Sequence, residues 1–354
     1  PLQGGFITAD LDLDHLRQER MRWTTFGDCV QAHRGQLEGY RRIEIELDVP
    51  ADPVRLDRGV ERFPYVPSDP ARRDERCAEV YDIQVEALRK RLAATGLKRV
   101  VIGISGGLDS TQVALVAVRA FDRLGLPRTN ILGYTLPGFG TSRQTFENAH
   151  ALMQALGITA GEIDIRTPAE LMLQHIGHPA AQGTPLHDIT YENVQAGERT
   201  SLLFRLANRN NALVLGTGDL SELALGFTTY GVGDHMSHYN VNASVPKTLI
   251  RHLIRWLVGA RQFDAATIDV LTRIVETPIS PALVPGAGDK PEQSSEAVVG
   301  PYDLQDFHLY YISRFGYRPS KVAYLAHCAW GDAGTGAWPD TVPPGERRSY
   351  DIAV

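Results

Sequence analysis

Short apolar segments alternate with amphipathic segments through the middle of the chain, and no other feature limits the possible folds as strongly. The apolar segments suit strands that are buried on both faces, and the amphipathic segments suit helices. In chain order we expect strand 99–104, helix 109–124, strand 130–135, helix 142–156, strand 162–165, helix 168–176, helix 193–210 and strand 212–215. Such alternation is typical of a parallel sheet. The sequence therefore predicts an α/β fold with a Rossmann-like parallel sheet and helices on both faces.

The chain on either side of this alternation is organised differently. Residues 1–48 hold a short apolar run and a charged helical stretch, and we expect them to be the end of a larger domain. Residues 49–70 are rich in proline and charge, which is typical of a linker or an extended arm. A regular helical pattern starts at residue 71, so we expect one domain over 71–354. Within it, the proline- and glycine-rich residues 278–301 have the length of a functional lid.

Charge and cysteine content argue against several classes of protein. The formal net charge is −6, whereas nucleic-acid binding needs clustered Lys and Arg, so we expect no nucleic-acid partner. No apolar run is long enough to span a bilayer, so we expect no membrane segment. Cys29, Cys77 and Cys328 form no CxxC pair, which argues against a zinc ribbon or a disulfide framework. We therefore expect a cytoplasmic protein, because the cytoplasm keeps thiols reduced.

Residues 103–110 (Gly-Ile-Ser-Gly-Gly-Leu-Asp-Ser) join the first expected strand to the first expected helix and carry the strongest functional signal. Gly106 and Gly107 let the backbone approach a ligand and direct N–H groups at it, and the serines add hydroxyl donors. The helix dipole favours negative charge at this end. Asp109 would repel a phosphate unless Mg²⁺ bridged the two. Because the GK[ST] ending of a Walker loop is missing, the sequence predicts a phosphate cradle of another type.

The pattern SGGxDS in this loop resembles the PP-loop of N-type ATP pyrophosphatases, which have an adenine nucleotide alpha hydrolase-like fold. These enzymes cleave ATP between the α and β phosphates, and the loop holds the leaving pyrophosphate. Three later segments, 192–199, 215–222 and 226–231, resemble those of NAD synthetases in their residues and in their order along the chain. They are most similar to the glutamine-dependent NAD synthetases of the mycobacterial type. The resemblance begins at about residue 71, and residues 1–48 resemble the end of that family's glutaminase domain.

The resemblance implies a role for each matching residue. The ATP-binding residues would be Gly103, Ile104, Ser105, Gly106, Gly107, Leu108, Asp109, Ser110 and Thr217. The residues that bind deamido-NAD would be Asn193, Glu222, Phe227, Thr228, Thr229 and Tyr230, with Arg199 as a further candidate nearby. Asp109 and Glu222 would be the catalytic residues and would bind Mg²⁺.

The resemblance also implies a reaction, that of a carbon–nitrogen ligase. The nicotinate carboxylate of deamido-NAD would attack the α-phosphorus of ATP, because a carboxylate has no good leaving group until it is adenylated. Ammonia would then convert the acyl-adenylate into NAD and AMP, while residues 278–301 closed over the site to exclude water. The implied partners are a glutaminase domain in the full-length protein, which would supply the ammonia, and further copies of the chain in a homodimer or larger homo-oligomer.

Two departures from the family pattern leave alternatives open. Ammonia-dependent NAD synthetases have Lys at the position of Thr229, and we expect Lys247 or Arg143 to compensate. The family's C-terminal basic helix has no counterpart, so we expect the C-terminus to be truncated. One alternative is another PP-loop enzyme such as a tRNA thiolase, which the missing CxxC and the acidic charge disfavour. Another is a nucleotide-sensing module that binds ATP or NAD without turnover.

Single residues also have simpler explanations. Without the family, Asn193 would be a helix cap, Glu222 a solvated helix residue and Thr217 a turn residue. The loop at 103–110 would be a glycine-rich turn with a Ser or Asp cap. His235 and His238 lie three residues apart in a glycine-rich stretch without a third ligand, so we expect no zinc site there.

Overall fold

The computed structural model describes residues 5–46, 48, 55–227, 233, 235–277, 283–284 and 295–354. The chain divides into two compact units. The sheet unit consists of Tyr65–Asp306 and Pro339–Pro343, and the helical unit consists of Pro1–Pro64, Phe307–Trp338 and Pro344–Val354. The sequence divided the chain into the end of a glutaminase domain (1–48), a linker (49–70) and a synthetase domain (71–354), and this division stays a prediction. Within the described part of the chain, no helix is long and apolar enough to cross a membrane.

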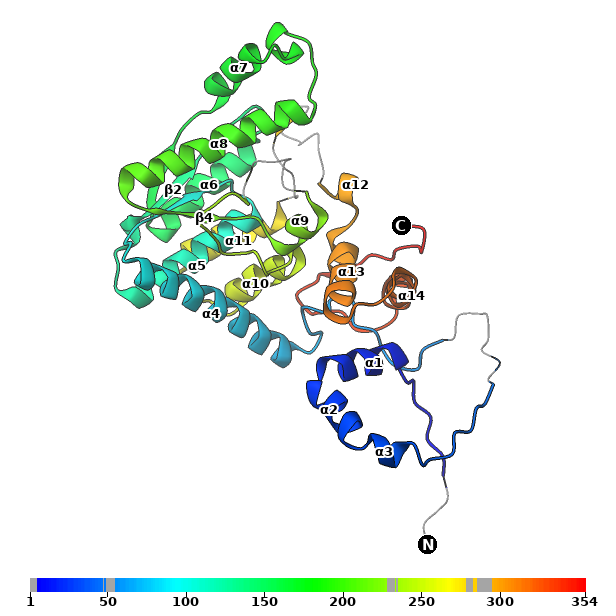
Figure 1. The fold of residues 1–354 in the computed structure, drawn as a ribbon. Helices are drawn as coiled ribbons and strands as arrows, with labels where there is room; N and C mark the ends of the chain where they lie inside the picture. Colours follow the sequence, from blue (N-terminus) through cyan, green and yellow to red (C-terminus); the bar gives the residue numbers. More distant parts are fainter. Residues whose placement is uncertain are drawn as a thin grey trace. The chain divides into compact units, whose positions relative to one another are not determined.

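A single five-stranded sheet forms the centre of the sheet unit (Figure 1). Its strands are β1 (Val100–Gly103), β2 (Ile131–Thr135), β3 (Thr159–Glu162), β4 (Leu213–Gly216) and β5 (Tyr239–Asn240). Their order is β3-β2-β1-β4-β5, and every pairing is parallel. Val100 of β1 pairs with Ile131 on one side and with Leu213 on the other. The predicted parallel α/β sheet is therefore confirmed, with one short strand more than the sequence indicated.

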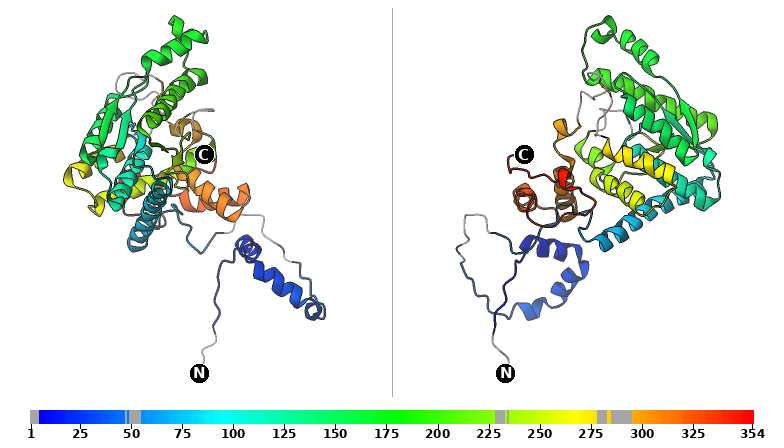
Figure 2. Two further views of the ribbon diagram at one scale, coloured as in Figure 1. Left: turned by 60° about the vertical axis from the view of Figure 1, so that its left-hand side comes forward. Right: turned by 180° about the vertical axis from the view of Figure 1, so that it is seen from behind.

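Helices cover both faces of this sheet (Figures 1 and 2). The helices of the sheet unit are, in chain order, α4 (Pro70–Thr95), α5 (Leu108–Leu124), α6 (Arg143–Leu156), α7 (Arg166–His175), α8 (Ile189–Asn210), α9 (Leu220–Leu225), α10 (Lys247–Gly259), α11 (Ala265–Glu276), α12 (Ser295–Val299) and the start of α13 (Tyr302–Phe315). Helix α8 packs on β1 and β4, where Ala207 lies in one core cluster with Val101 and Val214. Helix α5 follows β1 and is contacted in turn by α4 and α10. Because both faces are covered, every residue of β4 is buried.

The strand–loop–helix context that the sequence predicted for residues 103–110 is present. Strand β1 ends at Gly103, and α5 begins at Leu108 with Gly107 as its N-cap. Helix α6 begins after Ser142, whose hydroxyl accepts a hydrogen bond from the Thr145 backbone N–H at 3.2 Å, as expected for a Ser cap. These boundaries agree with the sequence prediction to within a residue, because local capping residues determine them.

Two predicted elements have different boundaries. The strand expected at 162–165 lies at Thr159–Glu162, because β3 is an edge strand that pairs only with β2 and its exposed side chains leave no apolar pattern. The helix expected to start at residue 193 starts at Ile189, and its N-cap is Asp188, which accepts a hydrogen bond from the Tyr191 N–H. Asn193 therefore does not cap this helix. Helix α11 was not predicted at all.

The helical unit is built from short helices and a cluster of aromatic rings. Its helices are α1 (Leu13–Arg22), α2 (Thr24–Ala32), α3 (Arg34–Leu37), α14 (Pro319–Trp330) and the part of α13 (Tyr302–Phe315) that follows Asp306. The buried Trp330 contacts Phe63 and Trp338 edge-on, and the guanidinium of Arg62 lies over the Trp338 ring at 4.5 Å. This unit thus has its own small core, which joins the two ends of the chain.

Candidate functional site

A cavity of about 390 Å³ opens at the carboxyl edge of the sheet. Its walls come from the ends of β1 and β4, from α8, and from the beginnings of α5 and α9. From β1 the chain continues through α5 to β2, which lies on one side of β1. Strands β4 and β5 lie on the other side of β1, so the strand order reverses beside this cavity. Open α/β sheets bind their ligands at such a reversal. The position of the cavity is therefore that of a ligand site.

The two adjacent glycines of the loop have different structural roles. Gly106 has φ of +80°, and a Cβ there would lie 2.1 Å from the backbone oxygen of Thr145 at the start of α6. Gly107 has an ordinary extended backbone, and a Cβ there would meet nothing closer than Ser105 Oγ at 3.4 Å. Gly107 lines the cavity, whereas Gly106 packs against α6. The first glycine is thus required by the fold, and the second keeps space for a ligand.

The two serines of the loop also differ. Ser105 lines the cavity, and its hydroxyl accepts the Gly107 N–H at 3.2 Å. Ser110 is buried, and its hydroxyl accepts the Ser105 N–H at 3.2 Å and donates to the Gly107 carbonyl at 3.3 Å. Of the two hydroxyls that the sequence suggested as phosphate donors, only that of Ser105 lies at the cavity. The hydroxyl of Ser110 holds the loop closed from behind.

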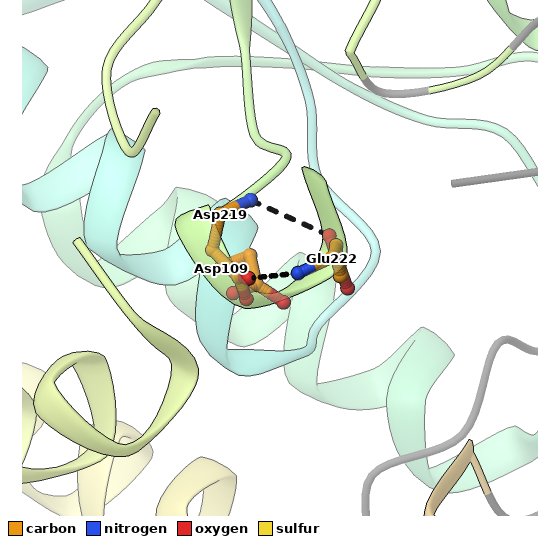
Figure 3. A group of neighbouring side chains, drawn as sticks. All are labelled: Asp109, Asp219 and Glu222. Carbon is orange, nitrogen blue, oxygen red and sulfur yellow. Dashed lines mark hydrogen bonds between the residues drawn. The ribbon is translucent and has the colours of Figure 1, made fainter. Parts of the chain in front are cut away.

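Three carboxylates lie together beside the loop (Figure 3), and one ammonium group contacts all of them. Asp109 comes from the first turn of α5, while Asp219 and Glu222 come from the segment after β4. The Nζ atom of Lys247, the first residue of α10, lies 2.6 Å from Asp109 Oδ2, 2.7 Å from Asp219 Oδ2 and 2.7 Å from Glu222 Oε1. The Lys247 side chain is only 2% exposed, and Asp219 is fully buried. We call these four residues the acidic cluster.

A capping box fixes two members of the acidic cluster. Asp219 is the N-cap of α9 and accepts a hydrogen bond from the Glu222 N–H at 2.8 Å. In return, the Asp219 N–H donates a hydrogen bond to Glu222 Oε2 at 3.4 Å (Figure 3). This reciprocal pair leaves Glu222 Oε1 for Lys247. Glu222 is therefore a capping residue at the cavity wall and not a solvated helix residue.

Burial and mutual repulsion perturb the titration of the cluster. Burial raises the pKa of Asp219 to about 9, and the neighbouring Asp109 carboxylate acts in the same direction. Burial alone would lower the pKa of Lys247, but the carboxylates of Asp109, Glu222 and Asp219 outweigh it and raise that pKa well above its usual value. Burial therefore favours the neutral form of Asp219, while the surrounding carboxylates favour the charged form of Lys247.

The chemistry of these donors fits a divalent cation that prefers oxygen ligands. One oxygen from each of Asp109, Asp219 and Glu222 lies within 4.8 Å of the others. Asp109 Oδ1 is buried and has no hydrogen-bond partner among the described residues, so this atom has a lone pair available for a ligand. Mg²⁺ is held through one or two carboxylates plus substrate phosphates. Asp109 and Glu222 line the cavity as such a site requires, and Asp219 lies behind them.

The residues that the sequence assigned to the substrate are distributed unevenly. Thr217 and Phe227 line the cavity, and so does Arg199, whose Nε donates to the Leu136 carbonyl at 3.1 Å. Asn193 lies on α8 but is not among the cavity-lining residues, so its contact with deamido-NAD stays a prediction. Thr228, Thr229 and Tyr230 lie outside the described residues, as does most of the proposed lid at 278–301. Of that lid, Leu283 and Ser295 line the cavity.

The structure separates the two cations that were expected to compensate for Thr229. Arg143 has an exposed side chain that pairs with Glu147 at 2.7 Å on the surface of α6. Lys247 instead lines the cavity. His238 is bound to strand β4, because its Nδ1 accepts the Val214 N–H at 2.9 Å.

Sequence reasoning missed Asp219 as a member of the acidic cluster. The residue stands directly before α9, where the sequence Gly-Asp-Leu-Ser-Glu has the spacing of a capping box. That spacing was an available signal, because a capping box brings the cap side chain and the N3 carboxylate to the same helix end. The burial of Asp219 next to Asp109 depends on the order of the strands, which no local sequence pattern indicates.

Together, the sheet order β3-β2-β1-β4-β5, the glycine-containing loop after β1 and the carboxylates at the edge of β4 define the PP-loop class of Rossmann-like α/β proteins. Residues 80–323 match the family model described as NAD synthase. The chain belongs to the NAD synthase family.

Proteins similar to this chain carry the name of an NAD synthetase. The chain is 53% identical over 344 residues to the "Glutamine-dependent NAD(+) synthetase" of Mycobacterium leprae, a match that covers 97% of this chain and 51% of that protein. It is 54% identical over 345 residues to the protein of the same name from Mycobacterium tuberculosis strain H37Rv, covering 98% and 51%. The chain therefore spans about half the length of the curated relatives that it matches.

Solved structures share the fold. An NMN synthetase from Francisella tularensis superposes with a TM-score of 0.54 at 22% identity, covering 72% of this chain and 92% of that one. A glutamine-dependent NAD(+) synthetase from Cytophaga hutchinsonii superposes with a TM-score of 0.56 at 18% identity, covering 70% and 44%. At these identities the likeness supports the fold alone.

Proposed function

We propose that this chain is the ligase portion of a glutamine-dependent NAD synthetase, which adenylates deamido-NAD with ATP and amidates it with ammonia. The observation that carries the proposal is the placement of Asp109, Glu222 and Lys247 beside a phosphate-type loop at the carboxyl edge of the sheet. The names of the relatives supply the substrate class.

In this proposal, residues 103–110 receive the pyrophosphate end of ATP. The loop backbone and the Ser105 hydroxyl face the cavity, where the dipole of the 17-residue helix α5 favours negative charge. Asp109 and Glu222 would hold Mg²⁺, which when bound neutralises phosphate charge. Lys247 contacts both carboxylates and keeps them in place before the nucleotide binds. Catalysis then rests on positioning and electrostatics, so no side chain is assigned as a general base.

The remaining wall of the cavity suits the second substrate. Phe227 marks the side next to α9, and Arg199 marks the side of α8, while Thr217 is left to ATP. The nicotinate carboxylate of deamido-NAD attacks the α-phosphorus of ATP, and the bond to pyrophosphate breaks. Ammonia then attacks the carbonyl carbon of the acyl-adenylate, and AMP leaves with the bonding electron pair. Exclusion of water matters here because water would compete with ammonia for the same carbon.

Ammonia supply and assembly extend the proposal beyond this chain. The matched relatives are about twice as long, and we assign the glutaminase function to the half that this chain does not match. Residues 1–48 are then the end of that glutaminase domain, 49–70 the linker and 71–354 the synthetase domain. We also propose a homodimer or larger homo-oligomer that works in the cytoplasm without a nucleic-acid partner.

One assay separates this proposal from its alternatives. The chain is incubated with ATP, Mg²⁺, deamido-NAD and ammonium chloride, and the products are followed by phosphorus NMR and mass spectrometry. We expect NAD, AMP and pyrophosphate, with none of them formed when deamido-NAD is omitted. ADP and orthophosphate would contradict cleavage between the α and β phosphates. Tight ATP binding without turnover would support the nucleotide-sensing module instead.

A further inference from the structure

Three side-chain amides form a buried chain directly behind the nucleotide site. Gln112 lies on α5, Gln84 on α4, and Asn242 in the segment between β5 and α10. Gln112 and Asn242 are fully buried, and Gln84 is 5% exposed. None of the three lines the cavity. Buried amides must be hydrogen-bonded to be tolerated, so their partners define what these three side chains hold together.

The hydrogen bonds define which way each amide points. Gln112 Nε2 donates to Gln84 Oε1 at 2.8 Å. Gln84 Nε2 donates to Asn242 Oδ1 and to the Val241 carbonyl, both at 3.1 Å. Because Asn242 Oδ1 is thus an acceptor, its Nδ2 must point the opposite way. There it donates to the carbonyl of Asp109 at 3.1 Å and to the carbonyl of Thr217 at 3.3 Å. Both amide hydrogens of Asn242 are therefore used.

The two carbonyls belong to the two loops on either side of the strand-order reversal. Asp109 lies at the start of α5, directly after the glycines of the phosphate-type loop. Thr217 follows β4 and lines the cavity. The amide of Asn242 bonds to both segments and so bridges the Asp109 carbonyl and the Thr217 carbonyl. Besides the pairing of β1 with β4 and the contacts of Lys247, the amide of Asn242 therefore links the two loops directly, and Gln84 holds that amide in turn.

We propose that Asn242 is a positioning residue for the nucleotide site, setting the separation between loop 103–110 and Thr217 to that required by ATP. This inference rests on the proposed function for the identity of the ligand. An apolar residue would fill the same space, but it would remove the hydrogen bonds that join the Asp109 and Thr217 carbonyls and one of the two bonds of Gln84 Nε2. Hence the amide has a geometric role in addition to filling the core. Asn242 touches no substrate and is not a catalytic residue.

The inference predicts a selective effect on ATP. Asn242→Asp keeps the shape but places a second acceptor against the two carbonyls, and Asn242→Ala removes the amide. Both variants should raise the KM for ATP at least tenfold and lower kcat/KM for ATP by roughly 10²-fold, since a displacement of about 1 Å can cost that much. The KM for deamido-NAD should stay within about twofold. Gln84→Leu, which leaves Asn242 free to rotate, should have a smaller effect of the same kind.

Tyr81→Phe is the matched control. The buried Tyr81 hydroxyl also joins α4 to a backbone carbonyl of α5, that of Leu115, at 3.0 Å, but it lies away from the loop. Its removal should lower the melting temperature and leave both KM values unchanged. A purely structural Asn242 would behave in the same way, with a lower melting temperature and an unchanged KM for ATP, and that result would overturn the inference. If the Asn242 variants do not fold, the KM for ATP of Gln84→Leu decides by the same criterion.

Calorimetry with a non-hydrolysable ATP analogue keeps this test separate from the proposed function. If the unaltered chain binds the analogue but forms no NAD, the proposed reaction is wrong, and weaker binding by the Asn242 variants still supports the inference. If the chain forms NAD and the variants bind the analogue as tightly as it does, the inference is wrong and the proposed function stands. If the unaltered chain does not bind the analogue, both are wrong.

Discussion

Lys247 and Asp109 form a buried ion pair of 2.6 Å although they are 138 residues apart in the sequence. Asp109 opens α5 after β1, and Lys247 opens α10 after β5, so the pair joins two helix starts on different sides of the strand-order reversal. The same ammonium also contacts Asp219 and Glu222, and it faces the Tyr302 ring at 5.6 Å. A single cation thus organises the acidic edge of the site.

Replacement of this cation should destabilise the fold in a way that metal reverses. Lys247→Met leaves the buried Asp219 and the partly buried Asp109 and Glu222 without their partner, which should lower the free energy of unfolding by about 3–5 kcal/mol. Mg²⁺ should then raise the melting temperature of the variant more than that of the unaltered chain. Urea unfolding measures the first effect, and thermal melting with and without Mg²⁺ measures the second. Lys90→Met, at an exposed position on α4, is the control and should change neither. A Lys247 variant that is as stable as the unaltered chain would contradict the structural role.

The two loop glycines should respond differently to the same added methyl group. Gly106→Ala places a Cβ against the Thr145 backbone at positive φ, so it should lower the melting temperature markedly. Gly107→Ala has space on the protein side and should fold normally. Its methyl group would enter the cavity, so affinity for ATP should fall. Thermal melting and calorimetry, applied to both variants, distinguish the two effects. Equal loss of stability in both variants would contradict this division of roles.

Asp109→Asn should uncouple activity from folding. The amide keeps the size of the side chain but removes the charge that would hold Mg²⁺, and we expect turnover to fall by roughly 10²-fold or more. Circular dichroism should remain unchanged. Asp122→Asn is the control on the same helix, because Asp122 pairs with Arg128 at the other end of α5. A near-normal rate for Asp109→Asn at saturating Mg²⁺ would show that Asp109 is not needed for turnover and serves only at the start of α5.

A buried histidine should make the sheet unit sensitive to mild acid. Burial lowers the pKa of His252 to about 3, and the nearby Arg255, Arg251 and Arg73 add to this effect. An unfolded histidine titrates near pH 6.5, so between these values the unfolded chain binds a proton that the folded chain does not. Stability is therefore lost as the pH falls below about 6.5, by about 2 kcal/mol between pH 7 and pH 5.

His252→Gln isolates this contribution. Glutamine can still hydrogen-bond to Thr341 Oγ1, which lies 2.8 Å from His252 Nδ1, but it does not titrate. The loss of stability between pH 7 and pH 5 should therefore be smaller in the variant than in the unaltered chain. His175→Gln makes the same change at an exposed position and should leave the pH dependence as it was. Denaturant unfolding at the two pH values gives the comparison. Identical pH dependence in His252→Gln would contradict the assignment.

The chain should use ammonium but not glutamine as its nitrogen donor. A glutaminase needs an activated nucleophile. Cys77 is buried in α4, and burial raises the pKa of its thiol to about 12, so it stays protonated at neutral pH. Cys29 and Cys328 are exposed on α2 and α14. NAD should form with ammonium chloride at high pH, where free ammonia is abundant, and stay at background with glutamine. Release of glutamate from glutamine by the purified chain would place the nitrogen-supplying site within these residues.

The sequence predicted those features that depend on local signals. Strand β1, the loop and the start of α5 are adjacent, so an apolar run, two glycines and a helix pattern were sufficient to place them. The Ser142 cap was predictable for the same reason. Strand β3 was misplaced because an edge strand needs no apolar alternation, and its boundary is determined by pairing with β2.

The acidic cluster depends instead on contacts between distant segments. Glu222 and Asp109 were identified from motifs, but the position of Lys247 between them requires β1, β4 and β5 to lie side by side. Lys247 was only one of two candidates for a missing cation, and nothing local distinguished it from Arg143. The contact of Asn242 with two loop carbonyls had no sequence signal, because any buried polar residue in a glycine- and asparagine-rich stretch would look the same.

The position of Lys247 has a consequence for the life of the protein in a cell. A site that needed its metal to offset three clustered carboxylates would fold only when magnesium and nucleotide were present, and the amount of folded protein would follow their supply. Here a residue of the chain itself balances those acids from the moment α10 packs against α5. Changes in magnesium or nucleotide concentration would then alter mainly how many molecules are loaded, and only to a smaller extent how many survive quality control.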